Sequence, residues 1–135
     1  MINRKELSVS MLEAFTCHSC KHLTEVLNDW TKGLYVILRL IDKSEKEIVA
    51  GDIAQKLNVS TARVAVALKT LEEKKWIKKY KSKTDARKTV VKLTPLGENI
   101  LRERMNYLSE LVEQFLNKLT EEEIYQLLNI IDKTM

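Results

Sequence analysis

Two cysteines and two histidines lie within one six-residue stretch, at Cys17, His18, Cys20 and His22. Thiolate and imidazole are preferred ligands of zinc and copper. On a helix that turns roughly 100° per residue, however, the four side chains span too wide an arc to close on one ion. His18 with His22, or Cys17 with Cys20, suits half a metal site completed elsewhere, for example by another subunit. The alternatives are a redox or effector sensor whose thiolate Lys21 and His18 would favour, and plain helix residues. We predict no cofactor and no resident metal.

A basic segment runs from residue 69 to residue 92, with ten Lys and Arg against three acids and a net charge of +7. The whole chain carries +4, which leaves −3 for the rest. The cations are Lys69, Lys74, Lys75, Lys78, Lys79, Lys81, Lys83, Arg87, Lys88 and Lys92. Such a concentration is typical of a surface that binds a polyanion, although a solvated, lysine-rich helix end would also show it.

Composition predicts the kind of fold that carries this basic segment. The chain has 135 residues, 44% of them hydrophobic, which suits a single domain with a real core. Only 3 Gly and 1 Pro favour a mainly α (α+β) fold over a turn-rich sheet. The first residues lack the apolar stretch of a signal peptide, and no run reaches the roughly 18 apolar residues of a membrane span. We therefore expect a cytoplasmic protein with reduced cysteines and no disulfide.

The N-terminal half predicts two helices before a loop. Apolar residues at helical spacing favour a first helix from about Glu6 to Asn28. Thr31 is a plausible N-cap for a second helix with an apolar surface up to Ile41. The polar stretch 42–47 then predicts a loop.

A helix-turn-helix follows. A short helix at about Gly51–Leu57 and a longer one at Thr61–Lys74 are separated by a few residues, with Ser60 as the second N-cap. Ala54 is small enough for the helix crossing, and Asn58 tolerates the left-handed geometry of a tight turn.

The longer helix has two faces. Val64, Leu68 and Leu71 share one side, which we expect to pack on the domain. The other side is offered to the major groove, where Arg reads guanine and small apolar groups touch the thymine methyl. The residues predicted to contact DNA there are Ser60, Thr61, Ala62, Arg63, Val66 and Lys69. A plain buried helix is the alternative.

Two short segments, Ile77 to Tyr80 and Val90 to Leu93, predict a hairpin with a basic tip. The tip residues predicted to contact DNA are Lys81, Lys83, Arg87 and Lys88. An arginine at this place suits a narrow minor groove. Asp85 would be repelled by phosphate, so we expect it to hold Arg87 or to cap the turn.

Two helices make up the C-terminal third. Thr94 and Pro95 form a strong helix start, and apolar residues carry that helix for more than twenty positions. Thr120 and Glu123 then form a capping box that opens a last helix.

Four segments together resemble the MarR (multiple antibiotic resistance regulator) family of winged helix-turn-helix proteins. They are Asp52 to Ser60, Leu71 to Ile77, Asp85 to Arg87, and Leu93 to Gly97. Each is weak alone, but their order and spacing are specific.

The resemblance implies about six helices with a hairpin wing, and a homodimer. Residues 1–30 and 95–135 would dimerise, and residues 31–94 would form the winged helix-turn-helix. It implies binding to pseudo-palindromic operators in double-stranded DNA, usually with repression. By the family's pattern, Arg87 is the wing arginine and Asp85 its partner.

Three departures from that pattern stand out. Lys75 occupies a position where the family often has Gly, so the turn after the second helix must differ or accept strain. Ala65 and Val66 replace a frequent Ser-Arg pair, so the base contacts differ. Val49 occupies the place of a Ser or Thr cap.

We therefore expect a dimeric transcriptional regulator, a repressor released by a small-molecule, redox or metal signal. The alternative is a winged-helix module that docks an acidic protein. An enzyme is not expected, because the chain has no Gly-rich phosphate loop, no third acid-base partner near Cys17 or His18, and no paired-carboxylate site.

Overall fold

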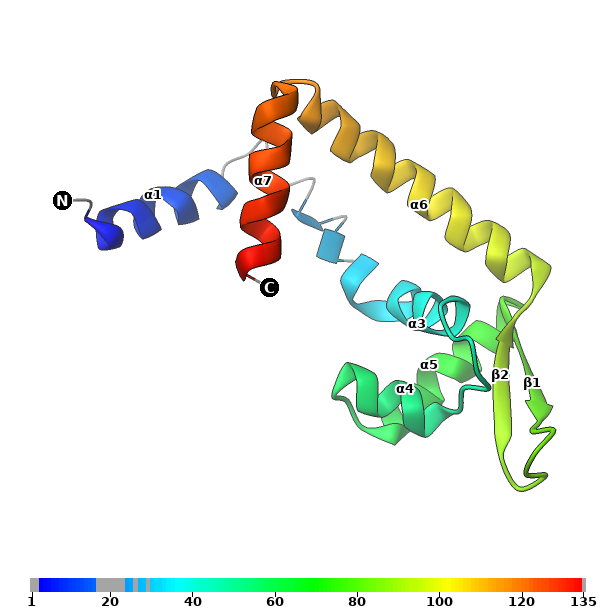
Figure 1. The fold of residues 1–135 in the computed structure, drawn as a ribbon. Helices are drawn as coiled ribbons and strands as arrows, with labels where there is room; N and C mark the ends of the chain where they lie inside the picture. The colour runs from blue at the N-terminus through cyan, green and yellow to red at the C-terminus, as the bar shows by residue number, and fades with distance from the viewer. Residues whose placement is uncertain (1–2, 17–23, 26, 29, 135) are drawn as a thin grey trace. The chain divides into compact units, whose positions relative to one another are not determined.

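A computed structural model describes residues 3–16, 24–25, 27–28 and 30–134 (Figure 1). The labelled elements are α1 (Arg4–Thr16), α3 (Gly33–Asp42), α4 (Ala50–Leu57), α5 (Thr61–Glu73), β1 (Ile77–Lys81), β2 (Thr89–Leu93), α6 (Pro95–Leu116) and α7 (Glu121–Thr134). Six helices and one antiparallel hairpin in the described part of the chain confirm the predicted mainly helical winged fold. None of the described helices is long and apolar enough to cross a membrane.

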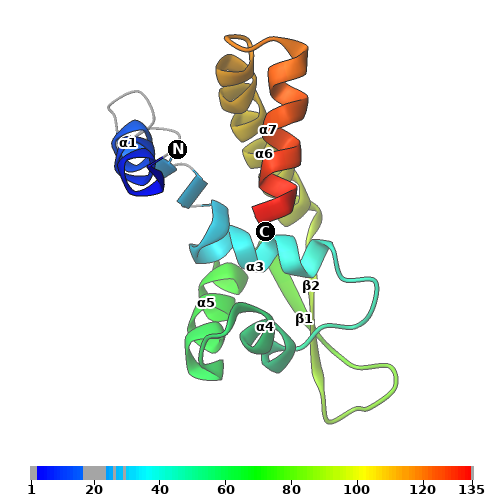
Figure 2. The same cartoon turned by 60° about the vertical axis from the view of Figure 1, so that its left-hand side comes forward.

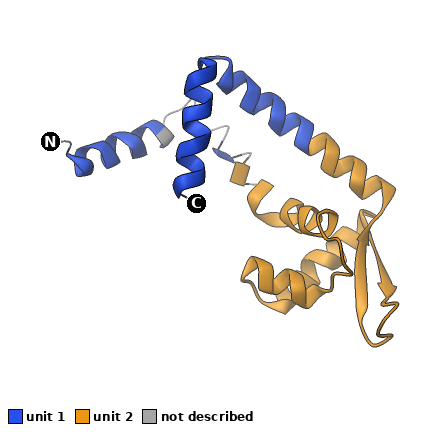
Figure 3. Cartoon of the chain, in the orientation of Figure 1, with its two compact units in different colours: residues 1–25, 105–135 blue, residues 26–104 orange. Residues whose placement is uncertain are grey.

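The chain divides into two compact units (Figure 3). The first combines residues 1–25 with 105–135, and the second contains residues 26–104. The second unit contains the whole helix-turn-helix and the hairpin. The predicted use of residues 1–30 and 95–135 for dimerisation concerns two chains and stays a prediction.

The core of the second unit comes from every element of the winged helix. Its most deeply buried side chains are those of Leu38, Ile53, Leu71 and Ile77, none more than 1% exposed. Burying a side chain of this size stabilises a fold by about 1.5–3 kcal/mol. Because these residues come from α3, α4, α5 and β1, the core joins the helix-turn-helix to the hairpin. Figure 2 shows the arrangement of these four elements.

The second helix does not begin at the predicted residue. The prediction of Thr31 as an N-cap is wrong. Its Oγ1 instead donates to the carbonyl oxygen of Leu27 at 2.9 Å, as a hydroxyl inside a helical turn does. Lys32 takes the N-cap position of α3 with extended backbone and no side-chain hydrogen bond.

The predicted first helix begins at Arg4, two residues early, and α1 ends at Thr16. Its predicted continuation through residues 17–23 lies outside the described residues. The sensor candidates Cys17, His18, Cys20 and His22 fall in that stretch, so they stay a prediction.

The two C-terminal helices begin as predicted. At α6, Thr94 Oγ1 accepts a hydrogen bond from the backbone N–H of Gly97 at 3.0 Å. At α7, Thr120 N donates to Glu123 Oε2 at 2.8 Å, and Glu123 N donates to Thr120 Oγ1 at 3.3 Å. This reciprocal pair is a capping box, and α6 runs for 22 residues.

Candidate nucleic-acid interface

The turn between α4 and α5 has the geometry that its sequence predicts. Asn58 adopts φ 52°, in the left-handed region that a short polar side chain tolerates. The backbone N–H of Val59 donates to the carbonyl of Ala54 at 3.1 Å, and that of Asn58 donates to Gln55 at 3.2 Å. This pair is a Schellman motif, which satisfies carbonyl groups in the last turn of α4. The chain turns there, and α5 begins at Thr61.

The start of α4 compensates for the missing Ser or Thr cap. Val49 has no acceptor on its side chain, but Asp52 Oδ2 accepts a hydrogen bond from the Val49 backbone N–H at 3.0 Å. A carboxylate in the first turn also interacts favourably with the helix dipole. The cap is therefore half satisfied.

Helix α5 exposes the face predicted to meet DNA. Ser60 caps it by accepting a hydrogen bond from the Arg63 backbone N–H at 3.2 Å, as predicted. Val64, Leu68 and Leu71 are 1%, 3% and 0% exposed, so the inner face is in the core. The side chains of Ser60, Thr61, Ala62, Arg63, Val66 and Lys69 are all exposed. Val66 is 68% exposed, so an apolar side chain lies on this outer face among polar and basic ones.

The turn after α5 accepts the strain expected of Lys75. This residue has φ 61°, and a second Schellman motif forms around it. The backbone N–H of Trp76 donates to Leu71 at 3.0 Å, and that of Lys75 donates to Glu72 at 2.9 Å. Glycine is the usual residue at this position because it has no Cβ.

The hairpin extends from this turn and away from the three helices α3, α4 and α5 (Figures 1 and 2). Ile77 pairs with Leu93 at its base, and Lys81 pairs with Thr89 at its far end. The predicted tip cations Lys81, Lys83, Arg87 and Lys88 are exposed. The hairpin therefore carries them away from the core.

Asp85 caps the turn at the tip. Its Oδ1 accepts a hydrogen bond from the backbone N–H of Arg87 at 3.0 Å, and its carbonyl accepts one from the N–H of Lys88 at 3.0 Å. The sequence suggests that Asp85 either holds Arg87 or caps the turn, and these hydrogen bonds to backbone N–H groups are a turn cap. The cap shapes the backbone from which the exposed Arg87 side chain extends.

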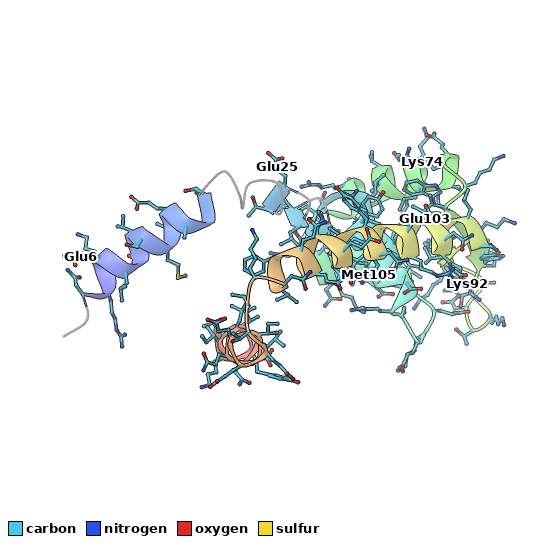
Figure 4. All side chains as sticks on the ribbon, turned by 90° about the horizontal axis from the view of Figure 1, so that it is seen from above. Glu6, Glu25, Lys74, Lys92, Glu103 and Met105 are labelled. Atoms are coloured by element: carbon cyan, nitrogen blue, oxygen red, sulfur yellow. The ribbon has the colours of Figure 1, made fainter. Side chains whose placement is uncertain are left out.

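Several cations of the basic segment interact within the chain. Lys79 Nζ lies 2.7 Å from Glu72 Oε2. The ammonium groups of Lys74 and Lys92 lie 5.1 Å and 5.8 Å from the ring centroids of Trp76 and Tyr80 respectively. Figure 4 labels both lysines among the side chains of the chain. These three lysines therefore support the scaffold, whereas the residues predicted to contact DNA lie on α5 and the hairpin tip.

A stack of aromatic rings and guanidinium groups supports the base of the winged helix. Tyr35 lies between Trp30 and Trp76, with centroid distances of 6.1 Å and 6.2 Å. Arg39 lies 4.8 Å over the Trp30 ring, and Arg104 lies 5.0 Å over the Tyr35 ring. The stack connects α3, the turn after α5 and α6, because Tyr35, Trp76 and Arg104 come from these elements. Each cation–π contact contributes about 0.5–2 kcal/mol.

Sequence reasoning missed one acidic residue, Glu47, in the loop before α4. Ser82 Oγ donates to its Oε2 at 2.5 Å, and the backbone N–H of Lys83 donates to its Oε1 at 3.0 Å. These two hydrogen bonds, followed by the positive charges of Lys92 and Lys83, lower the pKa of Glu47 below its ordinary value of 4.5, although desolvation opposes them. Its partners lie 35 and 36 residues away, so no local pattern reveals the contact.

A groove of about 300 Å³ lies beside the start of α5. It is lined by Thr31, Lys32, Gly33, Leu34, Val36, Ile37, Leu57, Val59, Arg63, Val64 and Ala67. The walls are mostly apolar, and the charged residues among them, Lys32 and Arg63, are both cationic.

Comparison with known proteins supports the same architecture. The sequence model described as the MarR family matches residues 30–89. No curated protein sequence matches the chain.

Three solved structures illustrate the fold. A mutant of MepR from S. aureus has 22% identity and a TM-score of 0.73, over 98% of this chain and 96% of its own. YusO from Bacillus subtilis has 21% identity and a TM-score of 0.77, over 97% and 93%. FabT from Streptococcus pneumoniae, in complex with DNA, has 19% identity and a TM-score of 0.69, over 98% and 94%.

Proposed function

We propose that this chain, which belongs to the MarR family through residues 30–89, is a dimeric, sequence-specific DNA-binding transcriptional regulator. It acts as a repressor and not as an enzyme. Helix α5 enters the major groove of double-stranded DNA, and the hairpin is a wing that contacts the adjacent minor groove. FabT and a second MepR mutant, whose structures contain DNA or an oligodeoxyribonucleotide, support this proposal by their shared fold.

The observation that carries the proposal is that one compact unit has both an exposed outer face on α5 and an exposed basic hairpin tip. The six predicted residues of α5 and its cap lie outside the core while Val64, Leu68 and Leu71 hold the helix in place. A helix of this kind contacts base edges from its N-terminal half, and the tip lysines and arginine neutralise phosphates. Because Ala65 and Val66 replace the frequent Ser-Arg pair, apolar contacts with thymine methyl groups take a larger share of recognition.

Exposed apolar side chains in the other unit support the homodimer. Leu7, Met11 and Leu12 of α1 are 54%, 60% and 64% exposed. Tyr125, Leu128 and Ile130 of α7 are 60%, 52% and 58% exposed. Apolar surface concentrated on two helices indicates a partner, and a two-fold symmetric dimer binds a pseudo-palindromic operator.

Release by a small-molecule signal is part of the proposal. The groove beside α5 suits an organic anion with an apolar body, since Lys32 and Arg63 supply the charge and the other lining residues supply apolar contact. Because Arg63 also belongs to the DNA-contacting set, a ligand held there competes with DNA.

Titration with duplex DNA tests the regulator against its alternative, a module that docks an acidic protein. A duplex selected by the purified protein from a random pool, and a scrambled duplex as control, are titrated at about 50 mM and 200 mM salt. We expect preference for the selected duplex and a loss of affinity of about 10³-fold or more over that range if six or more phosphates are contacted. Affinity that is weak and equal for both duplexes would reject the regulator and favour the docking module.

A further inference from the structure

The wing has an internal hydrogen-bond centre at Ser82, the residue that follows β1. Ser82 is only 8% exposed, and its Oγ accepts hydrogen bonds from the backbone N–H groups of Thr84 and Asp85, both at 3.2 Å. Its own N–H donates to the carbonyl of Lys88 at 2.9 Å. The position of Ser82 therefore determines the path of the chain that presents Lys83, Arg87 and Lys88.

Ser82 is held from outside the wing by Glu47. The carboxylate receives the Ser82 hydroxyl on Oε2 and the Lys83 backbone N–H on Oε1, so both oxygens bind the start of the wing. The next residue in the loop, Ile48, accepts a hydrogen bond from the N–H of Val91 in β2 at 3.0 Å. The loop that leads into α4 is thus bonded to both arms of the hairpin.

The charge of Glu47 is unfavourable for the proposed function. It is an exposed carboxylate in a region with Lys46, Lys83 and Lys88, where an acid repels DNA phosphate. Electrostatics alone therefore predicts that removing this charge strengthens DNA binding. The hydrogen bonds predict that the change to Gln weakens DNA binding. The amide of Gln has one oxygen that accepts and an NH2 group that only donates, so it cannot replace both carboxylate oxygens.

We propose that Glu47 is a positioning residue for DNA binding, which fixes the wing against the loop that leads into the helix-turn-helix. The proposal rests on the proposed function. Glu47 makes no contact with DNA itself; it sets where the tip cations lie relative to α5. Charge-assisted hydrogen bonds to a carboxylate are stronger than neutral ones, which suits an anchor that must hold a two-stranded hairpin in place.

The test compares Glu47→Gln with Glu45→Gln, an equal change of charge in the same exposed loop. Affinity for a duplex selected from a random pool is measured by fluorescence anisotropy at fixed salt, with thermal melting as a check of folding. We expect E47Q to bind about three- to tenfold more weakly, the equivalent of one lost hydrogen bond, and E45Q to bind as well as the wild type or better. E47Q binding as tightly as E45Q would overturn the proposal.

A double-mutant cycle shows whether Glu47 acts through the wing. In the Arg87→Ala background the wing has already lost its main contact with DNA. Misplacing the wing by E47Q should then change the affinity by no more than about twofold. In the Arg63→Ala background, which removes a contact of α5 instead, the effect should persist in full. An undiminished effect of E47Q in the R87A background would contradict the proposal.

Ser82→Ala provides a second variant that leaves every charge in place. It should reduce DNA affinity as E47Q does, and the two changes together should cost little more than either alone, since they break one network. Additive losses would show that the two residues act separately and would overturn the proposal. If R87A itself leaves affinity unchanged, the wing contact in the proposed function is what fails.

Discussion

Gly97 of α6 lies directly against the backbone carbonyl of Trp76. A Cβ on Gly97 would overlap the carbonyl oxygen and lie 2.9 Å from the carbonyl carbon. Two hydrogen bonds close the same junction, because the backbone N–H of Thr94 donates to Trp76 O at 3.0 Å and Thr94 Oγ1 donates to Lys75 O at 2.6 Å. The turn after α5 and the start of α6 are thus joined at one place, which requires a residue without a side chain.

Replacing Gly97 with Ala should destabilise the protein. The added methyl group forces the backbone of Trp76 to move, and overpacking of this kind costs about 1–3 kcal/mol of unfolding free energy. Gly51→Ala is the matched control, since nothing lies within 4 Å of a Cβ there. In α4 that change should add up to about 1 kcal/mol by helix propensity. Equal melting temperatures for G97A and wild type would contradict the close approach.

Replacing Lys75 with Gly should stabilise the protein. Lys75 has φ 61°, a conformation that costs an L-residue about 1–2 kcal/mol and costs glycine almost nothing. The greater freedom of glycine in the unfolded chain reduces the gain to below about 1 kcal/mol. Denaturant unfolding measures it, with Lys75→Ala as the variant that keeps the strain. A K75G protein less stable than K75A would show that the turn is not strained.

Replacing Arg87 with Ala should weaken binding to the selected duplex by about 1–3 kcal/mol and reduce the salt dependence by the equivalent of one phosphate or groove contact. Lys118→Ala is the control. It removes the same charge between α6 and α7, outside the winged helix, and should leave the affinity nearly unchanged. Similar losses for both variants would indicate a general effect of net charge rather than a wing contact.

Replacing Leu128 with Glu should convert the proposed dimer to a monomer. Tyr125, Leu128 and Ile131 are exposed at a spacing of three residues on α7, so a charge at the middle of this stripe disrupts an apolar interface. Asn129→Asp introduces a charge at a neighbouring exposed polar position and should leave the dimer intact. Sedimentation velocity reports the state, and a dimer that survives L128E would exclude this stripe from the interface.

The contribution of Glu47 to stability should depend on pH. Its pKa in the folded protein lies below the ordinary 4.5, because Lys83 N–H and Ser82 Oγ donate to the carboxylate. The stabilisation is therefore complete above that ordinary value and is lost as the pH falls through the lower folded-state value. The difference in melting temperature between wild type and E47Q should shrink between about pH 5 and pH 3. A constant difference across that range would contradict the assignment.

Local features of the winged helix could be predicted because each depends on a few neighbouring residues. Ser60 and Thr94 are N-caps, Asn58 is the left-handed turn residue, and Lys75 takes the strained position, all as the sequence indicates. The prediction of Thr31 as an N-cap failed because of another local interaction. A threonine hydroxyl inside a helical turn can donate to the carbonyl four residues earlier, here that of Leu27.

The sequence by itself determined the order of elements, the inner and outer faces of α5 and the basic hairpin tip, because helical period, capping chemistry and charge are local properties. Only the tertiary structure decided that Glu47 holds Ser82 and that Gly97 meets Trp76. Those contacts join residues far apart in the chain, and their partners are chosen by how the core brings the elements together rather than by any spacing along the sequence.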